Sequence, residues 1–178
     1  LNAPFSRSRI TLEQVFNSIR PSQYLVGGAL TKEIYTMAEE RGLVIHDYLK
    51  REELAVLNSV PTAEGAVQLA MEELPITIRG CRCLITGYGR VGKTLAQLLV
   101  AMGAQVTVAA RNFADLAWAT AHGCSTLELK HLAEAGEYDV IFNTVPALLF
   151  DREVLSKLDK KTLLIDLASR PGGVDFTA

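Results

Sequence analysis

Cysteine, histidine and tryptophan are scarce in this sequence, with three, three and one copies among 178 residues. The cysteines form no CxxC pair and are odd in number, which argues against a disulfide framework or a zinc site. The histidines are scattered and show no ligand spacing. We therefore expect no metal site and a structural or surface role for all six side chains, namely Cys81, Cys83, Cys124, His46, His122 and His131.

An excess of either charge is also missing, and so are long apolar runs. Lys and Arg number 18 against 20 Asp and Glu, which gives a net charge of −2 and indicates no nucleic-acid-binding surface. No run is long enough to span a bilayer and no signal peptide opens the chain, so we expect a soluble, cytoplasmic protein. Hydrophobic residues make up 49% of the chain. This suffices for one compact domain, or for one domain plus part of another.

Apolar runs alternate with helical patterns along the chain. This alternation predicts an α/β fold of the Rossmann type, a doubly wound parallel sheet covered on both faces by helices. The predicted strands are residues 24–30, 43–48, 83–86, 105–109, 125–127, 139–143 and 162–166. The predicted helices are residues 32–41, 61–74, 90–102 and 113–121, with a short helix after residue 127.

The pieces at both ends look too few to complete their domains. A complete dinucleotide fold usually has six strands, and no helix follows the last predicted strand. We interpret the chain as the middle of a longer two-domain protein. Residues 1–57 are the remnant of a smaller N-terminal α/β domain, residues 58–78 an inter-domain helix and linker, and residues 79–178 a Rossmann domain with an incomplete C-terminal end.

The stretch LITGYGRVGKT, residues 84–94, matches two phosphate-binding motifs. Gly87, Gly89 and Gly92 spell the dinucleotide fingerprint G-x-G-x-x-G, and residues 87–94 also spell the P-loop G-x-x-x-x-G-K-T. Both motifs follow a strand, open a helix and hold phosphate on backbone N–H groups. The P-loop interpretation even has a possible acidic partner in Asp166, at the end of the run LLID.

The context favours the dinucleotide. Gly89 stands where a dinucleotide fold needs close backbone approach to the pyrophosphate, and a P-loop needs no glycine there. A second strand follows at the expected distance, and the 86 residues after Gly92 are few for a triphosphatase core. The predicted cofactor-binding residues of this loop are Gly87, Gly89, Arg90, Val91 and Gly92.

The end of the second strand predicts which dinucleotide is bound. An NAD site normally places Asp or Glu there to accept from the ribose 2′-OH. Here Ala110 and Arg111 stand at that point, and no acid occurs before Asp115. Arg111 is suited to a 2′-phosphate, so we expect NADP; the alternative is an exposed loop arginine.

Ligands of open α/β sheets bind beyond the carboxyl ends of the strands, where two further loops lie. We expect the first, residues 143–146, to meet the nicotinamide-side ribose, although a proline-ended strand with a turn-forming asparagine is the alternative. In the second, residues 166–176, Arg170 is suited to a carboxylate. The alternatives are an ion pair of Arg170 with Asp175 and an Asp166 that caps local N–H groups. The residues of interest are Asn143, Thr144, Val145 and Pro146 for the cofactor, and Ser169, Arg170, Gly172 and Asp175 for substrate and catalysis.

Thr62 and Glu64 lie at the start of the predicted inter-domain helix. As ordinary helix residues, they would be an N-cap and a first-turn acid. As functional residues, they would face the nicotinamide from the inter-domain cleft. We then expect Thr62 to contact substrate and Glu64 to act as a candidate base.

Several of these stretches together resemble the A subunit of bacterial dipicolinate synthase. They are NSVPTAEG, ITGYGRVGKTLA, GAQVTVAAR, IFNTVP and, most specifically, LLIDLASRPGGVDF. The resemblance covers residues 58–176, and the first 57 residues fit only loosely. It implies a two-domain, NADP-dependent oxidoreductase of spore-forming bacteria, active in sporulation. That enzyme would oxidise dihydrodipicolinate, or its hydrated precursor, to dipicolinate beside a flavoprotein-like B subunit, and a homo-oligomer is possible.

The residues agree with that chemistry but leave its details open. A dianionic ring calls for arginine or helix N-termini, and hydride transfer requires a base that takes up a proton. Glu64 and Asp175 are candidates for the base, and the missing N-terminal part is a third source. Two rivals remain: a hydroxyacid-type dehydrogenase, which would need a histidine–carboxylate pair, and a non-catalytic dinucleotide-sensing domain.

Overall fold

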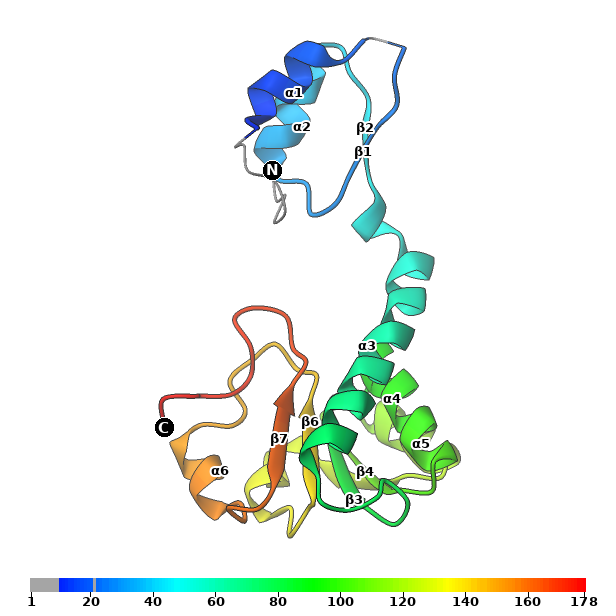
Figure 1. Cartoon of the computed structure of the whole chain (residues 1–178), viewed down its shortest axis with the longest axis vertical. Helices are drawn as coiled ribbons and strands as arrows, with labels where there is room; N and C mark the ends of the chain where they lie inside the picture. Colours follow the sequence, from blue (N-terminus) through cyan, green and yellow to red (C-terminus); the bar gives the residue numbers. More distant parts are fainter. Residues whose placement is uncertain (1–9, 21) are drawn as a thin grey trace. The chain divides into compact units, whose positions relative to one another are not determined.

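The computed structural model describes residues 10–20 and 22–178, which fall into two units, Leu1–Ala55 and Val56–Ala178 (Figure 1). The first nine residues of the expected N-terminal remnant therefore lie outside the described residues. Helix α3 (Glu52–Glu73) begins in the first unit and continues into the second. The boundary between the two units therefore lies inside this helix, after Ala55. The sequence predicted that the N-terminal remnant ends two residues later, at residue 57.

The first unit is a small α/β layer. Strands β1 and β2 pair in parallel, and Phe16, Ala38 and Leu43 form a small core between the helices and the strands. Helix α1 was not predicted, although Thr11 and Gln14 form a capping box at its start. The elements are α1 (Leu12–Ser18), β1 (Leu25–Gly27), α2 (Lys32–Glu39), β2 (Ile45–Asp47) and the 3₁₀ helix η1 (Tyr48–Lys50).

The second unit is built on a five-stranded, all-parallel sheet in the order β5-β4-β3-β6-β7. This is the strand order of a dinucleotide fold, which reverses direction between β3 and β6 and so creates a crevice at their carboxyl ends. The predicted doubly wound fold is confirmed. Its strands are β3 (Arg82–Thr86), β4 (Gln105–Ala110), β5 (Ser125–Glu128), β6 (Val140–Asn143) and β7 (Leu163–Asp166).

Helices cover both faces of this sheet. One apolar cluster joins α3, α4 and α5 to one face through residues such as Ile85, Leu95 and Val108. A second cluster joins η2 and α6 to the other face through Leu84, Leu132 and Ile141. Consecutive strand residues thus point to opposite faces, and both faces are buried, as a parallel sheet requires. The helices are α4 (Arg90–Ala101), α5 (Phe113–Ala121), the 3₁₀ helix η2 (Leu129–Glu134) and α6 (Arg152–Lys157).

The predicted element boundaries are correct to within a few residues, except at α3. The helical periodicity of the sequence predicted this helix from residue 61. It instead begins at Glu52 and carries Pro61 in its interior. The short helix α6 was also not predicted, although Asp151 caps it by accepting from the Val154 N–H.

Among the described residues, no helix has the length and hydropathy that crossing a membrane would require.

Candidate functional site

A cleft of about 480 Å³ opens at the carboxyl end of the sheet, at the switch between β3 and β6. Nine of the predicted site residues line it, together with one that was not predicted. The unpredicted residue is Leu167, which directly follows β7, a position that the strand-end rule alone would have indicated. The lining consists of Gly87, Gly89, Arg90, Val91, Arg111, Thr144, Val145, Pro146, Leu167 and Ser169.

The three glycines of the fingerprint are required for three different reasons. Gly87 has φ +90° and turns the chain after β3, and a Cβ there would meet the Thr144 side chain at 2.6 Å. A Cβ on Gly92 would lie 2.3 Å from the Gly87 carbonyl oxygen, so this glycine lets α4 pack against the strand end. A Cβ on Gly89 would meet no protein atom within 4 Å. Gly89 is therefore the position where space is left for a ligand, at the N-terminus of α4.

The Lys93–Thr94 pair of the P-loop interpretation is engaged elsewhere. The Lys93 ammonium lies over the Tyr88 ring, 5.6 Å from its centroid. The Thr94 hydroxyl contacts the Arg90 carbonyl at 3.0 Å and the buried Ser59 hydroxyl at 2.7 Å, which joins α4 to α3. Asp166, the supposed acidic partner, accepts hydrogen bonds from three N–H groups of the protein. These contacts argue against a triphosphatase site.

Among the described residues, none that lines the cleft beside the end of β4 is acidic. Strand β4 ends at the buried Ala110, and the exposed Arg111 follows and lines the cleft. The Asn112 side chain caps α5 by accepting from the Ala114 N–H at 2.9 Å. A guanidinium, and no carboxylate, therefore stands where a dinucleotide fold contacts the 2′ position of the ribose.

Asn143 does not have the expected role. Its side chain is completely buried, and all of its hydrogen-bonding groups are used inside the protein. The Asn143 side chain does not line the cleft, so the structure gives no support to the prediction that it contacts the cofactor. Its neighbours Thr144, Val145 and Pro146 do line the cleft, so the loop itself was placed correctly.

The loop after β7 places Ser169 in the cleft, whereas Arg170 and Gly172 do not line it. Arg170 is exposed, and in the described part of the chain it forms no ion pair with Asp175. The Asp175 carboxylate instead accepts from the Thr177 amide and hydroxyl, and the hydroxyl contact holds the pKa of Asp175 below its usual value. A carboxylate stabilised in this way is a weaker base, so Asp175 loses support as the catalytic base.

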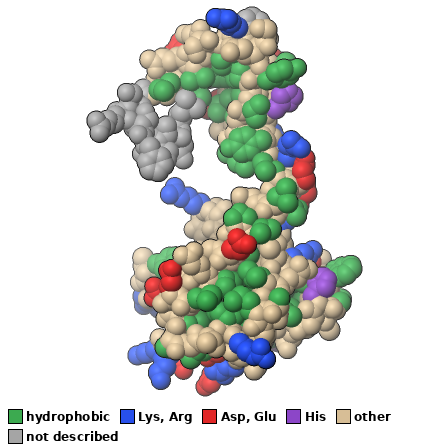
Figure 2. All heavy atoms as spheres, turned by 45° about the vertical axis from the view of Figure 1, so that its right-hand side comes forward, with side chains coloured by type: hydrophobic (Ala, Val, Ile, Leu, Met, Phe, Trp, Pro, Cys, Tyr) green, Lys and Arg blue, Asp and Glu red, His purple; other side chains and the backbone are tan. Residues whose placement is uncertain are grey.

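Thr62 and Glu64 are not at the cleft. The Thr62 hydroxyl donates to the Asn58 carbonyl inside α3, ten residues after the helix begins, so Thr62 is not an N-cap either. Glu64 borders a separate, mostly apolar groove between α3 and α4 with Val67, Met71 and Leu98. Figure 2 shows apolar side chains gathered on the surface of this unit. These α3 residues share one helix face, and Glu64 does not line the cleft, so the structure gives no support to the prediction that Glu64 acts at the nicotinamide.

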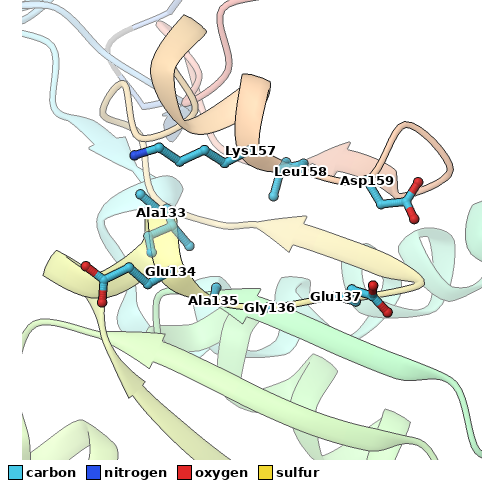
Figure 3. Close-up of a pocket in the computed structure, with 9 residues that line it drawn as sticks. Ala133, Glu134, Ala135, Gly136, Glu137, Lys157, Leu158 and Asp159 are labelled. Carbon is cyan, nitrogen blue, oxygen red and sulfur yellow. The ribbon is translucent and has the colours of Figure 1, made fainter.

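A second polar hollow lies at the opposite end of the sheet, among residues that precede β6 and β7 (Figure 3). It has a volume of about 410 Å³ and lies between the end of η2 and the end of α6. Its charged side chains are Glu134, Glu137, Lys157 and Asp159. Ligands of this fold bind beyond the carboxyl ends of the strands, so this hollow is on the wrong side for the dinucleotide.

The scarce side chains differ in their surroundings. All three cysteines are buried, and no cluster among the described residues has the ligands for a metal ion. His122 has a role that its position in the sequence did not indicate, since its Nδ1 lies 2.8 Å from the Tyr88 hydroxyl. Tyr88 belongs to the fingerprint loop, so this contact ties the loop to the end of α5.

The chain is similar to known proteins over nearly its whole length. It is 34% identical over 174 residues to the A subunit of dipicolinate synthase from Bacillus subtilis, which covers 97% of this chain and 59% of the relative. The crystal structure of that protein matches with a TM-score of 0.84, over 97% of this chain and 58% of that one. The corresponding A subunit from Bacillus halodurans matches at 32% identity with a TM-score of 0.85, over 97% and 60%.

These relatives confirm the resemblance seen in the sequence, although this chain spans less than two thirds of their length. The family model for the NAD-binding domain of D-isomer specific 2-hydroxyacid dehydrogenases matches residues 56–178, which is the second unit. The chain thus carries the dinucleotide-binding domain of an oxidoreductase. It belongs to the family of D-isomer specific 2-hydroxyacid dehydrogenase NAD-binding domains and is a homologue of the dipicolinate synthase A subunit.

Proposed function

We propose that this chain is part of a cytoplasmic oxidoreductase that oxidises dihydrodipicolinate, or its hydrated precursor, to dipicolinate with NADP. The observation that supports this most is the cleft, in which the fingerprint loop and Ser169 of the SRPGG loop face one another. A dinucleotide-sensing domain needs the first of these loops but not the second. The relatives named for this synthesis cover 97% of the chain, including both loops.

The cleft residues fit a dinucleotide phosphate. Open space at Gly89 admits a pyrophosphate against the N–H groups at the start of α4. Arg111 is exposed beside the ribose position and supplies a cation for a 2′-phosphate. NADP, when bound, supplies the hydride acceptor; the protein orients the substrate ring and excludes water.

On the substrate side, Ser169 and Arg170 are the proposed binding groups. Ser169 lines the cleft and offers a hydroxyl, and the adjacent Arg170 offers a planar cation that suits a carboxylate. Gly172, at φ +88°, turns the loop behind them. Because Glu64 and Asp175 do not line the cleft, we propose that the base comes from the rest of the longer protein. The proposed partners are a second copy of the protein, in a homo-oligomer, and a B subunit.

A hydroxyacid-type dehydrogenase is the second candidate, because the matching family model is named for that class. Its chemistry would need a histidine near the nicotinamide. His122 is bonded to Tyr88, and His131 lies 3.3 Å from Glu134, one of the residues around the polar hollow at the other end of the sheet. In the described part of the chain no histidine lines the cleft, which favours the dipicolinate reaction.

The test is a reduction assay on the full-length protein, with and without a B subunit. NADPH formation from dihydrodipicolinate supports the proposal. NADH or NADPH formation from 2-hydroxy acids alone would favour the second candidate. If the protein binds the cofactor but turns over neither substrate class, a non-catalytic dinucleotide-sensing domain is the remaining interpretation.

A further inference from the structure

Three polar residues form a row across the carboxyl edge of the sheet. Thr86, Asn143 and Asp166 are the last residues of β3, β6 and β7, and the strand register sets them side by side. Thr86 and Asn143 are completely buried. We call these three residues the polar row. Buried polar groups are costly unless they are hydrogen-bonded, so their contacts indicate what the row is for.

Each contact within the row is made. The Thr86 hydroxyl donates to Asn143 Oδ1 at 2.6 Å, and Asn143 Nδ2 donates to Asp166 Oδ1 at 2.8 Å. The Asn143 side chain also binds the backbone of the loop that follows β6. Its Nδ2 donates to the Val145 carbonyl and its Oδ1 accepts from the Val145 N–H, both at 3.1 Å. Asn143 therefore fixes a loop that lines the cofactor cleft without touching the cleft itself.

Asp166 fixes the second loop in a similar way. Its carboxylate accepts from the Ala168 N–H at 3.1 Å and from the Gly173 N–H at 2.9 Å. These two amides bracket Ser169 and Arg170. Gly173 also packs tightly against the row, since a Cβ there would lie 2.1 Å from Asn143 Nδ2. Its carbonyl accepts from the N–H groups of Leu149 and Phe150, both at 3.0 Å, which holds the far end of the loop.

We propose that the polar row is a positioning device that sets the Ser169–Arg170 loop relative to the cofactor loop. The inference rests on the proposed function, because it assigns substrate binding to Ser169 and Arg170. Asn143 holds the cofactor side through Val145, Asp166 holds the substrate side through Ala168 and Gly173, and one hydrogen bond joins the two. A positioned substrate reacts faster than a loosely held one, so loosening the row lowers turnover without touching a reacting group.

The test variant is Asp166→Asn. A carboxamide has one acceptor oxygen in place of two, so it cannot serve the Asn143, Ala168 and Gly173 donors together. The matched control is Asp151→Asn, since Asp151 also accepts a backbone N–H, from Val154, but does so at the start of α6. Hydrogen exchange of the full-length protein is the first measurement. The Ala168 and Gly173 amides, which donate to Asp166 in the parent, should exchange at least about tenfold faster in Asp166→Asn than in the control or the parent.

The second measurement separates cofactor binding from turnover. NADPH affinity of Asp166→Asn should stay within about threefold of the parent, whereas kcat/KM for dihydrodipicolinate should fall by about 10–100-fold. Gly173→Ala, which presses on Asn143 and Val145 from the loop side, should show the same faster exchange and the same loss of turnover. If Asp166→Asn does not fold, hydrogen exchange of Gly173→Ala and of the parent still tests the proposal. The parent must protect the Ala168 and Gly173 amides from exchange, because both donate to Asp166.

Three results would overturn the inference. They are an unprotected Gly173 amide in the parent, unchanged exchange in both variants, and faster exchange with unchanged turnover. A parent that oxidises no dihydrodipicolinate would instead count against the proposed function. In that case the exchange data would still show whether the row holds the loop.

Discussion

A Cβ atom on Gly92 would lie 2.3 Å from the backbone carbonyl oxygen of Gly87, too close to fit unless the backbone shifts. Gly89, between them, has the opposite surroundings, since a Cβ there meets nothing within 4 Å. Its φ of −79° and ψ of −161° suit any residue. One motif therefore contains a glycine that the fold requires and a glycine that only a ligand would require.

Substituting these two glycines separately should distinguish folding from binding. Gly89→Val should change the free energy of unfolding by less than about 1 kcal/mol and abolish NADPH binding, because the side chain fills the pyrophosphate position. Gly92→Ala should destabilise the protein by about 1–3 kcal/mol or more, because α4 must move away from Gly87. Urea unfolding and NADPH titration of both variants provide the check. Undiminished NADPH binding by Gly89→Val would show that the fingerprint loop does not hold the pyrophosphate.

Arg111 should set the choice between NADP and NAD. Arg111→Ala should weaken NADP binding by about 1.5–3 kcal/mol and change NAD binding little, because NAD offers the guanidinium only a hydroxyl. Adding Ala110→Asp should shift the preference further toward NAD. Raised salt should weaken NADP binding more in the parent than in Arg111→Ala, since the contact is exposed. If the parent binds NAD and NADP with equal affinity, Arg111 does not bind the 2′-phosphate and is an ordinary solvated loop residue.

The sequence predicted the sheet and the cofactor loops because those features depend on local patterns. Apolar runs set the strands, and the glycine spacing places the turn between β3 and α4. Arg111 and Ser169 line the cleft, and the sequence indicated this position because each lies just past the end of a strand and the carboxyl ends of parallel strands share one edge. Local rules of this kind need no knowledge of which side chains are buried.

Three further predicted site residues, Asn143, Thr62 and Glu64, do not line the cleft. A strand-end asparagine can face the cleft or the protein, and only the positions of Thr86 and Asp166 on neighbouring strands decide between them. The expected positions of the two α3 residues depended on a helix start at residue 61, whereas the helix begins at Glu52. Once α3 begins at Glu52, the face that carries Glu64 packs along α4 and not toward the cleft.

The buried thiol of Cys83 should make stability fall at alkaline pH. Burial, with the neighbouring Cys81, raises the pKa of the Cys83 thiol far above its unfolded value of about 8.5. Above that pH the unfolded chain loses this proton while the folded protein keeps it, so unfolding releases a proton and a rising pH favours it. Well below that pH, near neutrality, the contribution is constant.

The size of this effect can be isolated with Cys83→Ala. Between about pH 9 and 10.5, Cys83 should contribute a decline of about 1.4 kcal/mol per pH unit in the free energy of unfolding. The slope for Cys83→Ala should be shallower by that amount, whatever the variant's stability at neutral pH. Urea unfolding across this range measures both slopes. Parallel slopes would show that the thiol ionises equally in the two states.

Arg170 should act on the substrate and not on the cofactor. Its guanidinium is exposed and forms no ion pair with Asp175, so it is available to a carboxylate. Arg170→Ala should raise KM for dihydrodipicolinate by about 10–150-fold, which corresponds to a charge-assisted contact of about 1.5–3 kcal/mol, and leave NADPH affinity unchanged. Arg170→Lys should restore only part of the loss, because an ammonium cannot form the planar, two-point contact of a guanidinium.

Arg152→Ala is a suitable control, because Arg152 lies at the start of α6 and influences Asp175 only through its charge. Steady-state kinetics of the three variants at saturating NADP make the comparison. An unchanged KM in Arg170→Ala would assign carboxylate recognition to other residues.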